Sequence, residues 1–299
     1  MALNKTQVTT AINDYGPMAQ IVAAVPELQG ILSNALTSQM SPNAFTAAVQ
    51  ASKWYQTHGD AYRNLLMTQA ADPATYNRTL ANAVNLVNQT AAQMGRQVDA
   101  NSMAYTYLIN GWTPQTLQSM IGLQGGITHG DSGAYTGDAA NLNDHMHEIA
   151  TSYGVPFTQQ WLDQAITQVQ AGRDSIDGFT NVIRNRAKMA YPQYAAQIDA
   201  GQTMTQIADP YMAQMAKTLE IPQTEVTLND PYIQKALSQR DPQSGAVTSQ
   251  PLWAFNQTLK QDPRYDKTDQ AKTDAYSTLA QVGKDFGFAA GAAAPGVGQ

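Results

Sequence analysis

One apolar pattern recurs along this chain and constrains its fold more than any other feature. It consists of an apolar residue and an aliphatic residue four positions later, followed in two places by an aromatic residue six positions further on. The copies are Phe45 with Val49 and Tyr55; Leu117 with Ile121; Phe179 with Ile183; and Phe255 with Leu259 and Tyr265. Residues four apart share one face of a helix, so each copy predicts an apolar stripe that runs into the C-terminal turn of a helix. Recurrence of this kind predicts internal helical repeats.

Signals for the starts and ends of helices surround these stripes. Ser41-Pro42 and Thr113-Pro114 each join a side chain that accepts amide hydrogens to a proline that fits the first turn, so each predicts the start of a helix. The same reasoning predicts helix starts at the Asp-Pro pairs, which lie at positions 72–73, 209–210, 230–231, 241–242 and 262–263.

Four further helices are predicted from apolar periodicity. Residues 74–95 form the clearest one, and Gly95 closes it. Residues 3–25 read as two short helices because Gly16-Pro17 interrupts their pattern. The last helix extends from Asp269 to Phe286, with Ala271, Ala275, Leu279 and Val282 on one face.

These patterns predict an all-α, multi-helix protein with internal repeats, a Gly-rich central loop and a flexible C-terminal tail. No run of alternating polar and apolar residues exceeds five positions, although residues 221–231 could hold one short strand. The expected segments are an N-terminal helical domain (1–123), the Gly-rich loop (124–143), a middle helical domain (144–219), a C-terminal helical region (220–288) and the tail (289–299).

Composition excludes several classes of function. The 299 residues contain no cysteine, which removes disulfides, thiol catalysis and cysteine-ligated zinc. The net charge is −6, whereas DNA-binding proteins usually carry a basic surface, so we expect no sequence-specific binding of nucleic acid. We find no signal peptide and no apolar run of the roughly 20 residues that a membrane span needs.

The polar residues are mostly uncharged. Charged residues make up 13% of the chain, against about 25% in typical soluble proteins, and the chain has 33 Gln but four Glu. Surfaces of amides and hydroxyls suit close association with neighbouring copies. A compositional bias of the source lineage explains the same counts equally well.

The strongest candidate for chemistry is a group of His and acidic residues beside the Gly-rich loop. The candidate metal ligands are His129, Asp144, His145, His147 and Glu148. On a helix Asp144 and Glu148 share a face, whereas His145 and His147 point apart, so the His-Glu-x-x-His pattern is absent. The alternative is a solvated helix start whose acids interact with the helix dipole. Glu148 is also the one plausible general acid for a peptidoglycan-cleaving reaction.

Aromatic residues are the candidates for an interface. We assign Trp54, Tyr55, Trp253 and Tyr265 as interface anchors, with burial in the core as the alternative for each. Trp54 and Tyr55 are the pair we expect to be partly exposed, because polar residues follow them.

Two stretches of the chain resemble a known group of proteins. The first contains Phe45, Val49, Ser52 and Trp54-Tyr55, then Tyr62-Arg63, Asp72-Pro73-Ala74 and a long helix that ends at Met94-Gly95. The second extends from Leu252 through Pro263-Arg264-Tyr265 to Thr268, Ala271 and Phe286-Gly287-Phe288. Over residues 20–110 and 205–288, the chain is similar to structural proteins of tailed bacteriophages, particularly those that infect actinobacteria.

This resemblance implies a structural protein of a phage particle, in the tail, at the tail tip or as an ejected internal protein. It implies assembly with other virion proteins and with further copies in closed symmetry, in a virion that is built in the host cytoplasm. The family brings no catalytic residue and no cofactor to this chain. Two alternatives remain open, namely a virion-associated peptidoglycan or metal-dependent hydrolase and a soluble helical adaptor.

Overall fold

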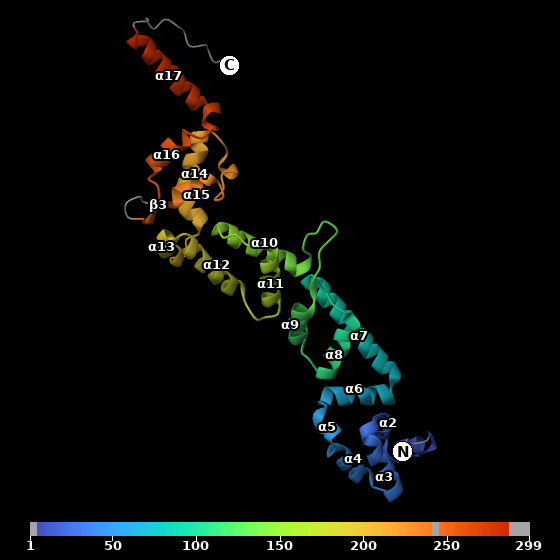
Figure 1. Ribbon diagram of the computed structural model, residues 1–299. Helices are drawn as coiled ribbons and strands as arrows, with labels where there is room; N and C mark the ends of the chain where they lie inside the picture. Colours follow the sequence, from blue (N-terminus) through green and yellow to red (C-terminus); the bar gives the residue numbers. More distant parts are fainter. Residues whose placement is uncertain (1–4, 241–244, 287–299) are drawn as a thin grey trace. The chain divides into compact units, whose positions relative to one another are not determined.

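The computed structural model describes residues 5–240 and 245–286 and confirms the all-α class. These residues contain seventeen α-helices and two sheets of two short strands each (Figure 1). The chain divides into two compact units, of which the first contains Met1–His145 and Gln159–Ser175, and the second contains Met146–Thr158 and Ile176–Gln299. The predicted tail at 289–299 and the Asp-Pro pair at 241–242 lie outside the described residues.

The first unit contains most of the helices that the N-terminal sequence predicts. Its elements are α1 (Lys5–Tyr15), α2 (Pro17–Ala24), η1 (Pro26–Leu28), α3 (Gln29–Ser38), α4 (Pro42–Gln50), α5 (Lys53–Thr57), α6 (Asp60–Ala71), α7 (Pro73–Met94), β1 (Arg96–Gln97), α8 (Ala100–Asn110), α9 (Pro114–Gln124), β2 (Gly126–Ile127) and α11 (Gln159–Gln170). The break at Gly16-Pro17, the starts at Ser41-Pro42, Asp72-Pro73 and Thr113-Pro114, and the end at Gly95 are confirmed.

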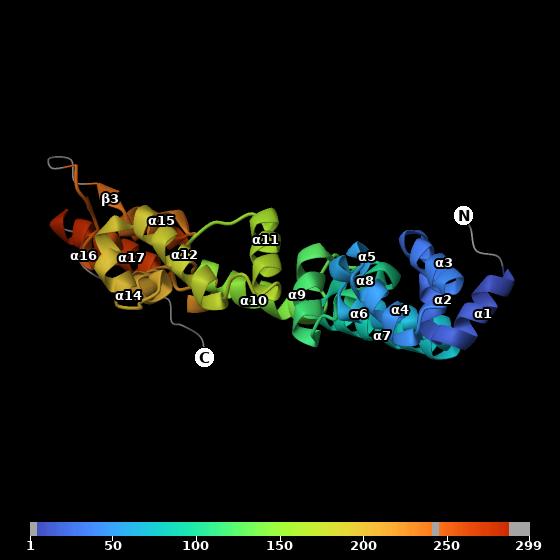
Figure 2. The same ribbon diagram turned by 90° about the horizontal axis from the view of Figure 1, so that it is seen from below.

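Two apolar clusters stabilise this unit. Helices α1 to α4 surround one cluster, in which Val22, Leu32 and Phe45 are at most 1% exposed. The hydroxyl of Tyr15 donates to the carbonyls of Ala35 and Met40 and so joins α1 to α3. The second cluster lies between α7, α8 and α9, and α6 packs against both α7 and α8 (Figure 2).

A buried arginine fixes the irregular segment between α9 and α10 (Gly137–Ser152). Arg96 in β1 is 4% exposed, and its Nη1 donates to the carbonyl of Gly125 over 3.0 Å. Its Nε donates to Oε1 of Gln170 over 2.6 Å, and its Nη2 donates to the hydroxyl of Thr167 over 3.1 Å. One guanidinium therefore joins β1, the residue before β2, and α11.

The segment predicted as a Gly-rich loop is partly ordered into regular structure. Strand β2 pairs antiparallel with β1, with Arg96 opposite Ile127, and His129 forms a bridge with Tyr135. Residues 137–143 belong to α10. The backbones at Gly95 and Thr136 approach each other closely here. A Cβ atom added at Gly95 would lie 1.9 Å from the carbonyl oxygen of Thr136.

The second unit contains the C-terminal helices. Its elements are the last turns of α10, then α12 (Ile176–Ala190), η2 (Pro192–Tyr194), α13 (Ala195–Asp199), α14 (Met204–Leu219), η3 (Gln223–Glu225), α15 (Pro231–Leu237), β3 (Gln239–Arg240), β4 (Val247–Thr248), α16 (Leu252–Leu259), η4 (Tyr265–Lys267) and α17 (Asp269–Asp285). Helices α14, α15 and α16 pack against one another and bury Met215, Ile233 and Phe255 completely. Helix α12 packs against η2 and α13.

The predicted stripes are buried, but their geometry differs from the prediction. All eight residues of the four pairs with spacing four are at most 2% exposed. The aromatic residues do not lie on the same helices. Tyr55 belongs to α5, after α4 has ended at Gln50, and Tyr265 belongs to η4, after α16 has ended. Each of the two copies with an aromatic residue is therefore a helix followed by a separate short helical turn.

Two predicted Asp-Pro helix starts are wrong. Pro210 lies inside α14, which begins six residues earlier at a capping box between Thr203 and Gln206. No helix begins at Asp262-Pro263, where the carboxylate of Asp262 accepts hydrogen bonds from the backbone and side chain of Arg264. The pair at 230–231 does begin α15. Residues 221–231 contain the 3-10 turn η3 in place of the strand that the sequence allowed.

The close approach at Gly95 leads to a prediction on stability. Gly95 and Gly111 share the left-handed conformation, with φ and ψ of 68° and 38° and of 59° and 37°, but a Cβ atom at Gly111 meets only the Cβ atom of Ala61, at 3.0 Å. Gly111→Ala should cost about 1–2 kcal/mol of unfolding free energy, chiefly for the backbone conformation. Gly95→Ala should cost about 1–3 kcal/mol more, because the new methyl group displaces the backbone at Thr136. Urea denaturation of both variants measures the difference, and equal losses would contradict the close packing.

Candidate assembly surface

The last helix, α17, leaves one apolar face uncovered. None of its residues is buried, and four large apolar side chains at its C-terminal end are among the most exposed in the described residues. The exposed fractions are 65% for Tyr276, 66% for Leu279, 44% for Val282 and 77% for Phe286. An isolated helix of this length is marginal in water, so its apolar face requires a partner surface to be stabilised.

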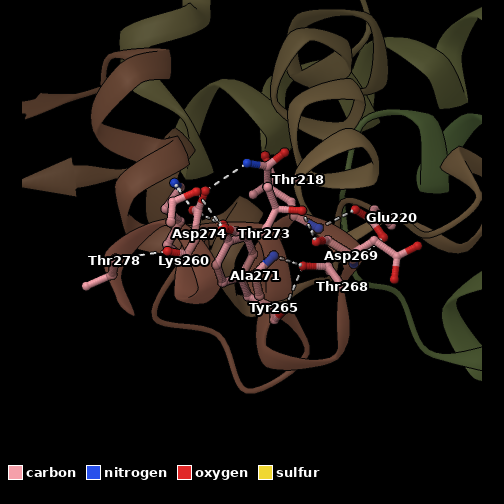
Figure 3. A network of polar contacts seen from close by, with 12 residues as sticks. Thr218, Glu220, Lys260, Tyr265, Thr268, Asp269, Ala271, Thr273, Asp274 and Thr278 are labelled. Atoms are coloured by element: carbon pink, nitrogen blue, oxygen red, sulfur yellow. Dashed lines mark hydrogen bonds and ion pairs between the residues drawn. The ribbon is translucent and has the colours of Figure 1, made fainter. Parts of the chain in front are cut away.

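The first turn of α17 is fixed by hydrogen bonds from another helix. Glu220, which directly follows α14, has φ 52°, and its carboxylate accepts from the amides of Asp269 over 2.8 Å and Gln270 over 3.0 Å (Figure 3). The hydroxyl of Thr268 accepts from the amide of Ala271 over 3.0 Å. A carboxylate is favoured at a helix N-terminus by the free amides and by the helix dipole. The two side chains together set the direction in which α17 leaves the unit.

The second turn is fixed by Asp274. Its Oδ2 accepts from Nζ of Lys260, which directly follows α16, over 2.9 Å and from the hydroxyl of Tyr265 over 2.7 Å (Figure 3). These contacts and a third from Gln270 lower the pKa of Asp274 to about 2. Beyond Asp274, no side chain of α17 makes a hydrogen bond to another element in the described part of the chain, so the apolar face begins where the anchoring network ends.

A second charged group holds the turn that precedes α17. Arg264 bonds to Asp262 over 2.6 Å and to Asp230, the cap of α15, over 3.2 Å. Asp262 is 3% exposed, and its hydrogen bonds to Arg264 hold its pKa below the ordinary value. The end of α16 is thereby joined to the start of α15.

Of the aromatic residues assigned to an interface, two lie in the same unit as α17. Trp253 in α16 is 74% exposed, so its ring is available to a partner. Tyr265 is 6% exposed and its hydroxyl bonds to Asp274, so a partner could touch little of it. The described contacts of Tyr265 are internal.

The other two assigned residues lie in the first unit and are half-buried. Trp54 stacks on His58 with ring centroids 4.7 Å apart, and His58 stacks on Tyr62 at 4.8 Å. The guanidinium of Arg63 lies 3.8 Å from the ring centroid of Tyr55. These partners order the aromatic rings at the start of α6, where they leave part of each ring at the surface.

The structure does not gather the candidate metal ligands. In the ranges 5–240 and 245–286, no three His, Asp or Glu side chains lie close enough to hold one ion. The ring of His129 lies 4.8 Å from that of Tyr135, and the ring of His147 meets Phe157 edge-on at 5.1 Å. Asp144, His145 and Glu148 are exposed along α10.

Sequence reasoning found part of this surface. The apolar face of α17 and its approximate bounds follow from periodicity. The contacts from Glu220 to α17 and from Asp274 to Lys260 were missed, because 49 and 14 residues separate these partners and no local pattern links them.

Comparison with models of protein families, with curated proteins and with solved structures finds no match to this chain. Among the described helices, none combines the length and the apolar character needed to cross a bilayer.

The contact between Lys260 and Asp274 leads to a prediction on pH. Carbon-13 NMR titration of the Asp274 carboxyl should give a pKa of about 2, and Lys260→Ala should raise it toward the ordinary value of about 3.9. Because the pKa is lowered in the folded protein, the contribution of Asp274 to the anchoring of α17 is complete above about pH 4 and is lost as the pH falls toward 2. Lys272→Ala is the control, since Lys272 bonds to Asp269 instead. An Asp274 that titrates near 3.9 in the unaltered protein would contradict the network.

Proposed function

We propose that this chain is a structural subunit of a tailed-phage particle and that it assembles with further copies of itself through α17. The observation that carries the proposal is the exposed apolar face of α17. A contiguous apolar face on a helix that is fixed at its base is typical of a site for protein association.

The spacing along α17 favours another α17 as the partner. Ala275, Leu279, Val282 and Phe286 follow one another at intervals of four, three and four residues. This is the heptad spacing that allows helices to supercoil around one another, with Leu279 at position a and Val282 at position d. The positions flanking this seam carry a single charge, at Asp285, so identical copies do not repel one another strongly.

Energetics favours closure into a symmetric assembly. Burying each of Leu279, Val282 and Phe286 contributes about 1.5–3 kcal/mol. Two heptads are short for an independent coiled coil, so a stable assembly needs a further surface. The exposed ring of Trp253 in the same unit supplies one. Symmetric contacts of this kind close into rings or bundles.

The virion is supported by the resemblance and by composition. The resembling stretch at 205–288 includes α16, η4 and all of α17. The low charged fraction of 13% suits close packing between many copies. We therefore propose the virion as the location of the assembled protein.

The assembly surface can be tested in solution. The full chain should form oligomers at micromolar concentration in size-exclusion chromatography with light scattering. Leu279→Glu combined with Val282→Glu should convert it to a monomer, because two carboxylates cannot be buried in the seam without a large desolvation cost.

The matched control introduces the same charge elsewhere on the same helix. Ser277→Glu combined with Gln281→Glu places two carboxylates off the apolar face and should leave the oligomer intact. A wild-type chain that stays monomeric at tens of micromolar, or a control that dissociates equally, would reject α17 as the assembly surface.

The phage particle can be tested separately. Quantitative mass spectrometry of purified virions, with copies counted against the major capsid protein, should find a fixed low number in multiples of three or six, because tail and neck proteins share the symmetry of the particle. Absence of the chain from the particle would reject the virion but not the self-assembly through α17.

A further inference from the structure

The second unit contains a cleft of about 940 Å³ that is independent of α17. Its walls come from the end of α10 and residues 153–157, the C-terminal end of α12, the first turns of α14, residues 223–229 and α15. The volume lies within the about 300–1,000 Å³ that is typical of sites for small molecules.

The floor of the cleft is apolar and well packed. The side chains of Val155, Met212, Val226 and Leu228 line it and are 6–7% exposed. Phe157 is half-buried at one side, and the ring of His147 meets it at an interplanar angle of 86°. An aromatic ring held in this way offers a rigid apolar platform to a ligand.

The rim of the cleft is polar but almost uncharged. Eight of the residues that line it have hydroxyl or amide side chains, namely Thr151, Tyr191, Thr205, Gln223, Thr224, Thr227, Asn229 and Gln234. None of the residues that line the cleft is Lys or Arg, and Asp209 is the one acidic residue among them. A phosphorylated or otherwise anionic ligand would find no cation to pair with, so this class of ligand is disfavoured.

Part of the rim is fixed and part is available. The hydroxyl of Tyr191 donates to Oε1 of Gln234 over 3.1 Å, and Nε2 of Gln223 donates to Oδ1 of Asp209 over 3.1 Å. The side chains of Thr224, Thr227 and Asn229 make no hydrogen bond within residues 5–240 and 245–286. Polar groups that line a cleft without a protein partner are free to bond to a ligand.

We infer that this cleft binds a short neutral oligosaccharide. A pyranose ring has an apolar face that fits the platform of Phe157, and hydroxyl groups around its edge that fit free amides and hydroxyls. None of the described strands lines the cleft, so a peptide has no sheet edge on which to add a strand. A purely apolar ligand would leave the polar rim without partners.

Isothermal titration calorimetry of the full chain tests this inference with four probes. The probes are chitotetraose, maltotetraose, an acetylated and amidated tetra-alanine peptide, and inorganic phosphate. At least one tetrasaccharide should bind at millimolar concentration or below, while the peptide and phosphate should show no saturable heat.

Two variants then locate the binding. Phe157→Ala should weaken the affinity about tenfold by removing the platform. Asn229→Ala should weaken it about fivefold by removing a hydrogen bond at an exposed position that does not affect folding. The matched control is Asn185→Ala, which is exposed on α12 outside the cleft and should bind like the unaltered chain.

Three results would overturn the inference. These are no binding of either tetrasaccharide, binding that both cleft variants leave unchanged, and tighter binding of the peptide than of both sugars. Thermal unfolding of each variant separates loss of binding from loss of fold. None of these results bears on α17, so the proposed assembly stands or fails separately.

Discussion

The unpaired amides at the start of each helix are the constraint on which this structure depends. A chain of many short helices exposes many such groups, and each needs an acceptor. Here most acceptors are local side chains: Ser41, Ser52, Asp72, Asp99, Thr113, Thr203, Asp230 and Thr268. Among the described helices, only α17 also has N-terminal amides that donate to a carboxylate distant in sequence, that of Glu220. This contact orients α17 relative to α14.

Charge has a second role, which is to hold the irregular segments. Arg96 and Asp262 are the two charged residues buried in the described part of the chain, and each lies where the backbone leaves a helix. Asp262 has a cationic partner in Arg264, whereas Arg96 bonds to neutral acceptors and burial lowers its pKa. Removing the acceptors of a buried guanidinium costs far more than removing a surface contact, so these positions tie the connections firmly to the helices.

Local patterns predicted the helices well, and failed where packing outweighed them. Gly95 ends α7 as expected because its φ is positive. Pro210 was expected to begin a helix, but Met204, Ala208, Met212 and Met215 form a buried stripe that continues past it. The stripe and the capping box at Thr203 together outweigh the one hydrogen bond that proline removes. The aromatic residues after α4 and α16 were placed on the wrong helices, and for Tyr55 the local signal was overlooked, since Ser52 caps the separate helix α5.

Periodicity cannot reveal which chain covers an apolar face. Val87 in α7 and Leu279 in α17 both lie on amphipathic helices, yet α8 and α9 bury Val87 completely while Leu279 stays 66% exposed. Nothing in the sequence of α17 distinguishes these outcomes, because burial depends on whether other helices of the chain pack against the apolar face.

The hydrogen bonds from the amides of Asp269 and Gln270 to Glu220 fix the direction of α17, which an unanchored amphipathic helix would lack. In the proposed assembly, a helix held at its base would present its face in one orientation, which would reduce the entropy lost when a second copy binds. Few charges would repel the approaching copy, so under this proposal the direction of α17 is the main determinant of how copies would meet.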